Sequence, residues 1–233
     1  MTSTGIDMAP PKFQTAKRTQ ESLLAPLERR ALHWLAAHTP RAINSDHLTL
    51  LGLASTAMIG ACYALSRWNK YTLFAGIVFL ALNWLGDSLD GTLARFRNQQ
   101  RPRYGFYVDH VVDTFGAAFI LGGLALSGFM HPLIALGLLV AFLMFSCEVY
   151  LATYTVGNFK ISYGMFSPTE LRVLLAVGNL ALFWRPQVHL FGSAETYRLF
   201  DVGGVCGMVG MIALLVVSAT KNTIHLYREE TVR

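Results

Sequence analysis

Long apolar stretches alternate with short polar connections along most of the chain. The apolar runs cover about residues 48–65, 72–93, 104–129, 132–154, 170–184 and 202–219. A helix that crosses a bilayer needs ~20 apolar residues, and the lengths and ends of these runs suit helices better than barrel strands. The pattern predicts an all-α membrane bundle of six transmembrane helices, with both chain ends on the same side.

The stretch before these runs has a different pattern. Apolar Leu23, Leu27 and Leu35 interleave with charged Glu28 and Arg29 at roughly helical spacing. This pattern is typical of an amphipathic helix that lies in the membrane interface. A soluble cap that packs on the bundle has the same pattern, so both interpretations stay open.

Composition and charge support the membrane prediction. Hydrophobic residues make up 53% of the sequence and charged residues only 14%, which is too apolar for a soluble domain of this size. The net charge of +5 does not indicate nucleic-acid binding, because the basic residues lie in short connections and form no stripe. Cys62, Cys147 and Cys206 all fall in apolar runs, so no disulfide framework is expected.

The basic residues also predict the orientation. Only four of the 19 lysines and arginines fall on one side of the six-span topology, namely Arg67, Lys70, Arg185 and Arg198. Positive residues concentrate on the cytoplasmic side of membrane proteins. We therefore expect a multi-pass protein of the cytoplasmic membrane with both termini in the cytoplasm.

Four carboxylates flank the connection between the second and third spans. Asp87 and Asp90 share one helix face, and Asp109 and Asp113 share another, because residues three or four apart project together. If the two helices pack side by side, the carboxylates cannot all ionise without a counter-charge. Pairing with Arg95 would leave an acidic excess, whereas two divalent cations would balance it. Oxygen ligands favour Mg²⁺ or Mn²⁺ over Zn²⁺, and ionisable groups at membrane depth indicate a functional site, here one that opens to the cytoplasm.

The same stretch carries a longer motif. It reads D-x-x-D-G-x-x-A-R, then a spacer, then G-x-x-x-D-x-x-x-D. Its eight positions are filled by Asp87, Asp90, Gly91, Ala94, Arg95, Gly105, Asp109 and Asp113. This arrangement resembles the signature of the CDP-alcohol phosphotransferase (CDP-alcohol phosphatidyltransferase) family.

The resemblance implies an activity. A substituted phosphate would pass from a CDP-alcohol, with CDP-diacylglycerol as the leading donor, to the hydroxyl of an acceptor alcohol, releasing CMP in phospholipid biosynthesis. The resemblance further implies that the four aspartates hold two divalent ions on the donor pyrophosphate and that Asp113 is also the general base. Gly91 and Ala94 would leave room for the nucleotide, with tight helix packing as a second role, and Gly105 would let the backbone approach its neighbour or the nucleotide. Arg95 would bind the donor's phosphate or ribose, with an arginine that snorkels to the interface as the alternative. A homodimer is implied as well.

The entry to the first span is similar to a second family pattern, I-x-P-N-x-L-T. Here it reads INSDHLT over residues 43–49, with Ser45 and Asp46 at the two departures. We expect Thr49 to reach the nucleotide. For Asp46 we favour the role of a helix N-cap over direct contact with substrate.

Several charged residues outside the motif are candidates for binding an acceptor or a lipid head group. Arg97, Arg101 and Arg103 could attract an anionic group or serve only as topology charges. His110 lies off the aspartate stripe, so we do not expect it to be a ligand. The candidate acceptor or head-group residues are Arg101, Glu148, Lys160 and Arg172, with bonding to a neighbouring helix as the alternative for Glu148.

The chain is then organised as one catalytic unit with short flanks. We expect a disordered cytoplasmic leader at 1–18, the amphipathic helix at 19–39, a six-helix membrane catalytic domain at 40–227 and a cytoplasmic tail at 228–233. One alternative is an aminoalcohol phosphotransferase, with a CDP-ethanolamine or CDP-choline type of donor and a lipid acceptor. The others are a prenyltransferase that uses Mg²⁺ on a pyrophosphate and a cation transporter with an intramembrane carboxylate cluster.

Overall fold

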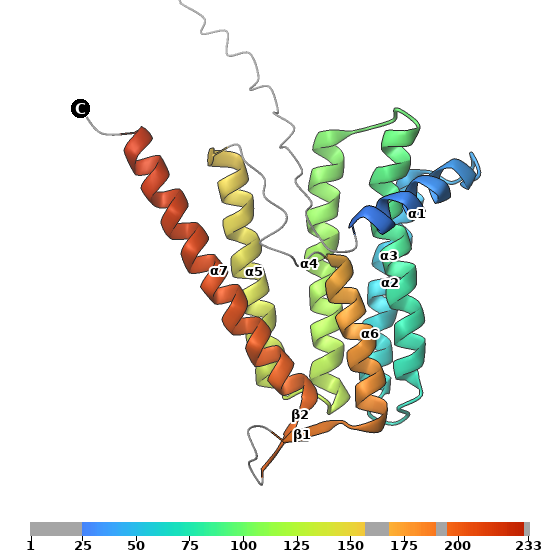
Figure 1. The fold of residues 1–233 in the computed structure, drawn as a ribbon, viewed down its shortest axis with the longest axis vertical. Coiled ribbons are helices and arrows are strands. Elements are labelled where there is room, and N and C mark those ends of the chain that lie inside the picture. Colours follow the sequence, from blue (N-terminus) through green and yellow to red (C-terminus); the bar gives the residue numbers. More distant parts are fainter. Residues whose placement is uncertain (1–24, 157–167, 190–194, 231–233) are drawn as a thin grey trace, which may run out of the picture.

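The computed structural model describes residues 25–156, 168–189 and 195–230, and these are mostly helical (Figure 1). The predicted leader, Lys160 and the last three residues lie outside the described residues. Within the described ranges the elements are α1 Ala25–His38, α2 Ser45–Leu65, α3 Thr72–Phe96, α4 Pro102–Ser127, α5 Pro132–Val156, α6 Pro168–Trp184, β1 Gln187–His189, β2 Thr196–Arg198 and α7 Leu199–Glu229.

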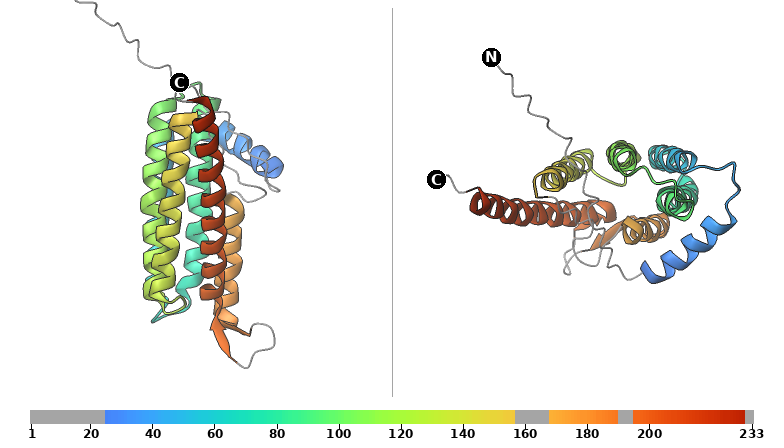
Figure 2. Two further views of the ribbon diagram at one scale, coloured as in Figure 1. Left: turned by 90° about the vertical axis from the view of Figure 1, so that its left-hand side faces the viewer. Right: turned by 90° about the horizontal axis from the view of Figure 1, so that it is seen from above.

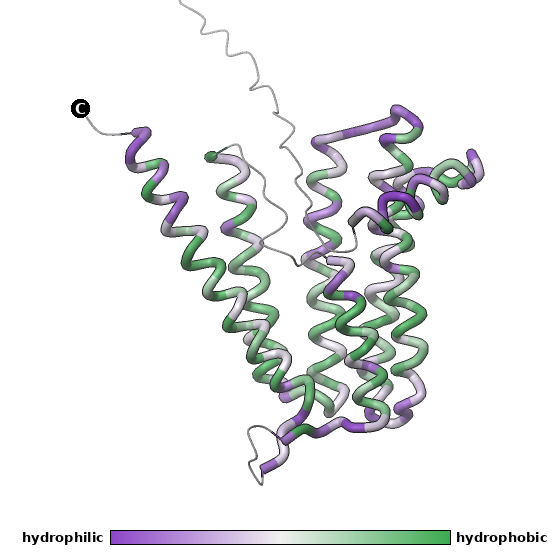
Figure 3. The backbone as a smooth tube through the Cα atoms, in the orientation of Figure 1, coloured by the Kyte–Doolittle hydropathy of each residue, from purple (hydrophilic) through white to green (hydrophobic). Residues whose placement is uncertain are grey.

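Five of the helices, α2, α3, α4, α5 and α7, are long and apolar enough to cross a membrane. Their middle turns are apolar and their ends are more polar (Figure 3). Helix α6 has 17 residues, or ~26 Å, which is shorter than a hydrocarbon core of ~30 Å. It lies beside α3 in the bundle (Figures 1 and 2). An all-α membrane bundle is therefore confirmed, while the sixth span stays a prediction.

Two features of the C-terminal third differ from the sequence-based expectation. Helix α7 continues past residue 219 to Glu229, because the sequence after Gly210 contains no glycine or proline to end it. The polar connection before α7 contains a small antiparallel sheet in which Val188 pairs with Tyr197. Strands of three residues show no readable alternation, so the sequence did not predict this hairpin.

Helix α2 packs against both α3 and α4, and glycines make both contacts close. A Cβ atom at Gly86 of α3 would lie 2.6 Å from the amide nitrogen of Gly52, and one at Gly123 of α4 would lie 2.7 Å from the carbonyl carbon of Gly60. Small residues let membrane helices approach this closely. As a result, α2 fixes the relative position of the two helices that carry the motif.

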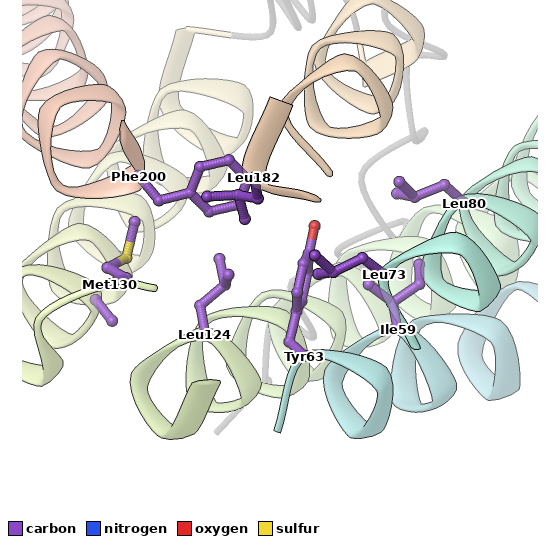
Figure 4. Packing of buried hydrophobic residues seen from close by; sticks show 9 residues of the cluster. Ile59, Tyr63, Leu73, Leu80, Leu124, Met130, Leu182 and Phe200 are labelled. Carbon is purple, nitrogen blue, oxygen red and sulfur yellow. The ribbon is translucent and has the colours of Figure 1, made fainter. Parts of the chain in front are cut away.

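The main apolar core (Figure 4) draws its residues from the later parts of α2, α4 and α6 and the earlier parts of α3, α5 and α7, so it lies toward the hairpin end of the bundle. Leu73, Leu124 and Leu182 come from three different helices and are fully buried. Tyr63 is also buried and donates a 2.8 Å hydrogen bond to Oδ1 of Asn179, which ties α2 to α6. This core anchors the end of the bundle that lies away from the aspartates.

Helix α1 lies obliquely across the other end of the bundle, beside α3 (Figures 1 and 2). Its buried residues Leu32 and Ala36 pack in a second apolar cluster with Leu89 of α3. Leu27 and Trp34 are exposed on the rest of its surface. The structure thus has a helix at Ala25–His38, while the amphipathic interfacial helix expected at 19–39 stays a prediction.

Candidate active site

Asp90 is the most enclosed of the four motif aspartates, with 7% of its surface exposed. Oγ1 of Thr49 donates to its Oδ2 at 2.7 Å, and the amide nitrogen of Gly91 donates to its Oδ1 at 2.5 Å. Oγ of Ser45 donates to its backbone oxygen at 3.0 Å. The first turns of α2 are therefore joined to the motif in α3, and Thr49 contacts Asp90.

Asp87 has a cationic partner from another helix. Nη2 of Arg172, on α6, lies 2.5 Å from Oδ2 of Asp87, and its Nε donates to Oδ1 of Asn83 at 2.7 Å. Asn83 and Asp87 are one turn apart on α3, and the planar guanidinium spans both. The sequence suggested Arg172 as an acceptor-binding residue, and the structure places it on a motif carboxylate.

Helix α4 brings the remaining carboxylates to the same end of the bundle. Asp90 lies within electrostatic range of Asp87 on the same helix and of Asp109 on α4. Asp113 is exposed and lies within electrostatic range of Tyr150 on α5. His110 lies against Tyr150 with 4.6 Å between ring centroids, and its place off the aspartate stripe stays a prediction.

The residues at this end suit a divalent cation by chemistry. Among the described residues, no group of three His, Cys, Asp or Glu side chains converges closely enough to hold a metal ion. However, oxygen ligands are those that Mg²⁺ and Mn²⁺ take, and carboxylates that bind metals are themselves usually held by hydrogen bonds. Asp87 and Asp90 are held in this way. The four motif aspartates therefore supply the kind of oxygen ligands that a divalent cation takes, and they would bind one by turning their carboxylates toward one another.

Within the described part of the chain, the motif glycines make no contacts between helices. The nearest atoms to a Cβ at Gly91 would belong to Arg95 of the same helix, at 3.4 Å, and no described residue would lie within 4 Å of a Cβ at Gly105. Nη2 of Arg95 donates to Oγ1 of Thr92 at 3.1 Å. Helix packing therefore does not explain why the motif has glycine at these two positions.

A cavity of about 470 Å³ opens between the first turn of α2, the end of α3 and the connection that follows. Ala94 lines it together with Asp46 and Arg101, which form an ion pair. The predicted N-cap role of Asp46 is wrong, because Asn44 is the N-cap and α2 begins at Ser45. Asparagine caps helices as well as aspartate does, and the sequence alone did not separate the two candidates. With Asn44 as the N-cap, Asp46 lies within the first turn of α2.

Arg97 has a structural role that the sequence did not indicate. It donates to the carbonyl oxygens of Ile43 (2.6 Å), Thr39 (2.9 Å) and Pro40 (3.0 Å). It therefore fastens the end of α3 to the connection between α1 and α2. Arg101 instead pairs with Asp46 and lies 4.2 Å from the ring centroid of Tyr104.

Glu148 faces α7. Its Oε1 accepts hydrogen bonds from Oγ of Ser218 at 2.9 Å and from Nδ2 of Asn222 at 2.7 Å. Its Oε2 is buried and accepts no hydrogen bond from the part of the chain that the structure describes. The structure thus supports the expected alternative of bonding to a neighbouring helix.

Sequence reasoning missed the role of Glu28 on α1. It is 8% exposed, and its Oε1 lies within hydrogen-bond distance of donors on α3 and α6. One signal could have found it, because Glu28, Leu32 and Ala36 follow one another at steps of four and therefore share a helix face. That face is the one that α1 buries.

Comparisons with known proteins agree with this arrangement. The sequence profile of the family named CDP-alcohol phosphatidyltransferase matches residues 43–220. The chain is 28% identical over 145 residues to the archaetidylinositol phosphate synthase of Methanothermobacter thermautotrophicus, covering 60% of this chain and 68% of that protein. It is 28% identical over 141 residues to the enzyme of the same name from Pyrococcus horikoshii, covering 59% and 70%. Since the profile covers well over half of its length, the chain belongs to the CDP-alcohol phosphatidyltransferase family, whose members synthesise phospholipids from CDP-alcohol donors.

Proposed function

We propose that this enzyme transfers a phosphatidyl group from CDP-diacylglycerol to a hydroxyl of an inositol phosphate and releases CMP at the cytoplasmic face of the membrane. The observation that carries this proposal is that α2 packs against both α3 and α4, and that Asp90 of α3 lies within electrostatic range of Asp109 of α4 as well as of Asp87. The acceptor class follows the names of the two archaetidylinositol phosphate synthases to which the chain is similar. The orientation rests on the positive-inside rule.

The four aspartates Asp87, Asp90, Asp109 and Asp113 would hold two divalent ions, either Mg²⁺ or Mn²⁺. When bound, the ions neutralise charge that develops on the donor phosphates. Two protein contacts support this assignment, because Thr49 holds Asp90 and Arg172 holds Asp87. Such contacts orient ligating oxygens in metal sites.

Asp113 is the proposed general base. It is exposed on α4, so an acceptor can reach it. Its carboxylate takes the proton of the acceptor hydroxyl. The hydroxyl oxygen then bonds to the phosphorus that carries the lipid, and the bond from that phosphorus to the CMP oxygen breaks.

The nucleotide would lie where the motif has small residues. None of the described helices other than their own lies within 4 Å of a Cβ placed at Gly91 or Gly105, and Ala94 lines the cavity at the end of α3. Arg95 is close enough to Gly91 to meet a phosphate or ribose placed there. Arg101, at the other side of the cavity, and Lys160 remain candidates for a phosphorylated acceptor, and the homodimer remains part of the proposal.

CMP release by the purified enzyme in detergent tests the proposal. CDP-diacylglycerol and inositol phosphate are supplied with Mg²⁺ or Mn²⁺. Asp113→Asn should lower the rate by at least ~100-fold, because a general base contributes about 10²–10⁴ in rate. Asp201→Asn is the matched control, since Asp201 lies at the hairpin end, accepts a hydrogen bond from the amide of His131 at 2.6 Å and should leave the rate unchanged.

Other results would point to the alternatives. CMP release only from CDP-ethanolamine or CDP-choline with diacylglycerol would indicate an aminoalcohol phosphotransferase. A folded protein that releases no CMP from any pair, yet carries Mn²⁺ into liposomes, would indicate a cation transporter.

A further inference from the structure

Glu28 joins three helices through one carboxylate oxygen. Its Oε1 accepts from Nε1 of Trp84 at 2.8 Å, from Oγ of Ser88 at 3.2 Å and from Oγ1 of Thr169 at 2.8 Å. Trp84 and Ser88 are one turn apart on α3, and Thr169 is in the first turn of α6. A buried carboxylate is costly unless it is hydrogen-bonded, so these contacts explain how α1 tolerates an acid on its buried face.

Two adjacent faces of α3 therefore form hydrogen bonds with two different helices, α1 and α6. Trp84 and Ser88 form the face that meets Glu28 of α1. Asn83 and Asp87 form the adjacent face, which meets Arg172 of α6. The start of α6 contributes to both contacts, because Thr169 and Arg172 are three residues apart on the same helix.

We propose that Glu28 is a positioning residue for the metal-binding carboxylates: by holding the first turn of α6 through Thr169, it sets Arg172 on Asp87. The proposal rests on the proposed function, in which Asp87 is a metal ligand. Arg172 binds Oδ2 of Asp87 and leaves Oδ1 to face a cation. If the first turn of α6 shifts, the guanidinium moves with it, and Asp87 loses the contact that fixes its rotamer.

The test measures Mn²⁺ binding by electron paramagnetic resonance on the full-length protein in detergent. Thr169→Val breaks the link to α6 and keeps the side-chain size. It should raise the Mn²⁺ dissociation constant about tenfold, because loss of a contact that orients a ligand typically costs 10–100-fold in metal affinity or activity. Ser88→Ala breaks only a link to α3 and should leave the constant within about twofold, since Thr169 and Arg172 stay in place.

Variants of Glu28 separate positioning from packing. Glu28→Ala should match Thr169→Val, and Glu28→Gln should retain most of the affinity, because its amide oxygen still accepts hydrogen bonds. Leu32→Ala loosens the same face of α1 without touching these bonds. In a background with Trp34, Trp68 and Trp184 replaced by phenylalanine, emission of Trp84 reports the loss of its bond to Glu28, so it should change in Glu28→Ala and stay constant in Thr169→Val.

The outcomes are distinct. Equal loss of Mn²⁺ affinity in Leu32→Ala and Glu28→Ala would mean that α1 acts only through packing, and it would overturn the inference. Unchanged affinity in Thr169→Val would overturn it as well, while leaving the metal site and CMP release of the wild type intact. A wild-type protein that binds no Mn²⁺ would overturn the metal assignment and this inference together.

Discussion

At the scale of single residues, the motif carboxylates are oriented by the protein itself. Thr49 and the amide of Gly91 hold the two oxygens of Asp90, and Arg172 holds one oxygen of Asp87. Hydrogen bonds to a charged group contribute about 1.5–3 kcal/mol each. The contacts therefore restrict which rotamers the two carboxylates adopt before any ligand arrives.

The hydroxyl of Thr49 can be tested by isosteric substitution. Thr49→Val removes the 2.7 Å bond to Asp90, so the Mg²⁺ concentration for half-maximal CMP release should rise about tenfold. Thr49→Ser keeps a hydroxyl and should resemble the wild type. If Val and Ser variants need the same Mg²⁺ concentration as the wild type, Thr49 does not orient a metal ligand.

At the scale of elements, α2 acts as the spacer between the two halves of the motif. It carries no motif aspartate, yet it contacts α3 at Gly52 and Gly86 and α4 at Gly60 and Gly123. The distance between α3 and α4, and so between the two carboxylate pairs, depends on how closely α2 packs against each.

Neighbouring glycines of α4 provide a matched test of this packing. Gly123→Ala would place its Cβ 2.7 Å from the carbonyl carbon of Gly60, whereas no residue that the structure describes lies within 4 Å of a Cβ at Gly122. Overpacking of this kind costs about 1–3 kcal/mol, so Gly123→Ala should lower the thermal unfolding midpoint and CMP release. Gly122→Ala should change neither, and equal midpoints for the two variants would contradict the close approach of α2 and α4.

At the scale of the whole molecule, the two ends of the bundle differ in charge. Arg67, Lys70, Arg185 and Arg198 all lie at the hairpin end, where Lys70 lies 4.6 Å from the ring centroid of Phe183 and β2 includes Arg198. Of the 14 lysines and arginines in the described residues, the other ten lie toward the opposite end, together with the four motif aspartates. This separation supports a site that faces the cytoplasm.

Labelling of single cysteines tests this orientation. In a variant with Cys62, Cys147 and Cys206 replaced by alanine, a maleimide that does not cross membranes should label Gln187→Cys in intact cells. Gln99→Cys, in the connection after α3, should be labelled only after the cells are opened. The reverse pattern would place the aspartates on the outer face.

The sequence by itself determined the residues of the motif, the membrane class and most helix positions. Apolar runs of bilayer length and the spacing of aspartates along a helix are local properties, so they can be read without knowing how helices pack. The bounds of α2 and α4 differ by only a few residues from those expected. The N-cap of α2 was misplaced because Asn44 and Asp46 are equally good caps and only backbone geometry separates them.

The tertiary structure alone decided which side chains meet. Arg172 contacts Asp87 across 85 positions of the chain, and Glu28 contacts Thr169 across 141. Glu148 bonds to α7, and Arg97 binds carbonyl groups beside α1. Such contacts depend on the rotation and depth of each helix against its neighbours, which close packing sets. Hydrophobic periodicity gives the face that a helix buries but does not name the residue that lies opposite.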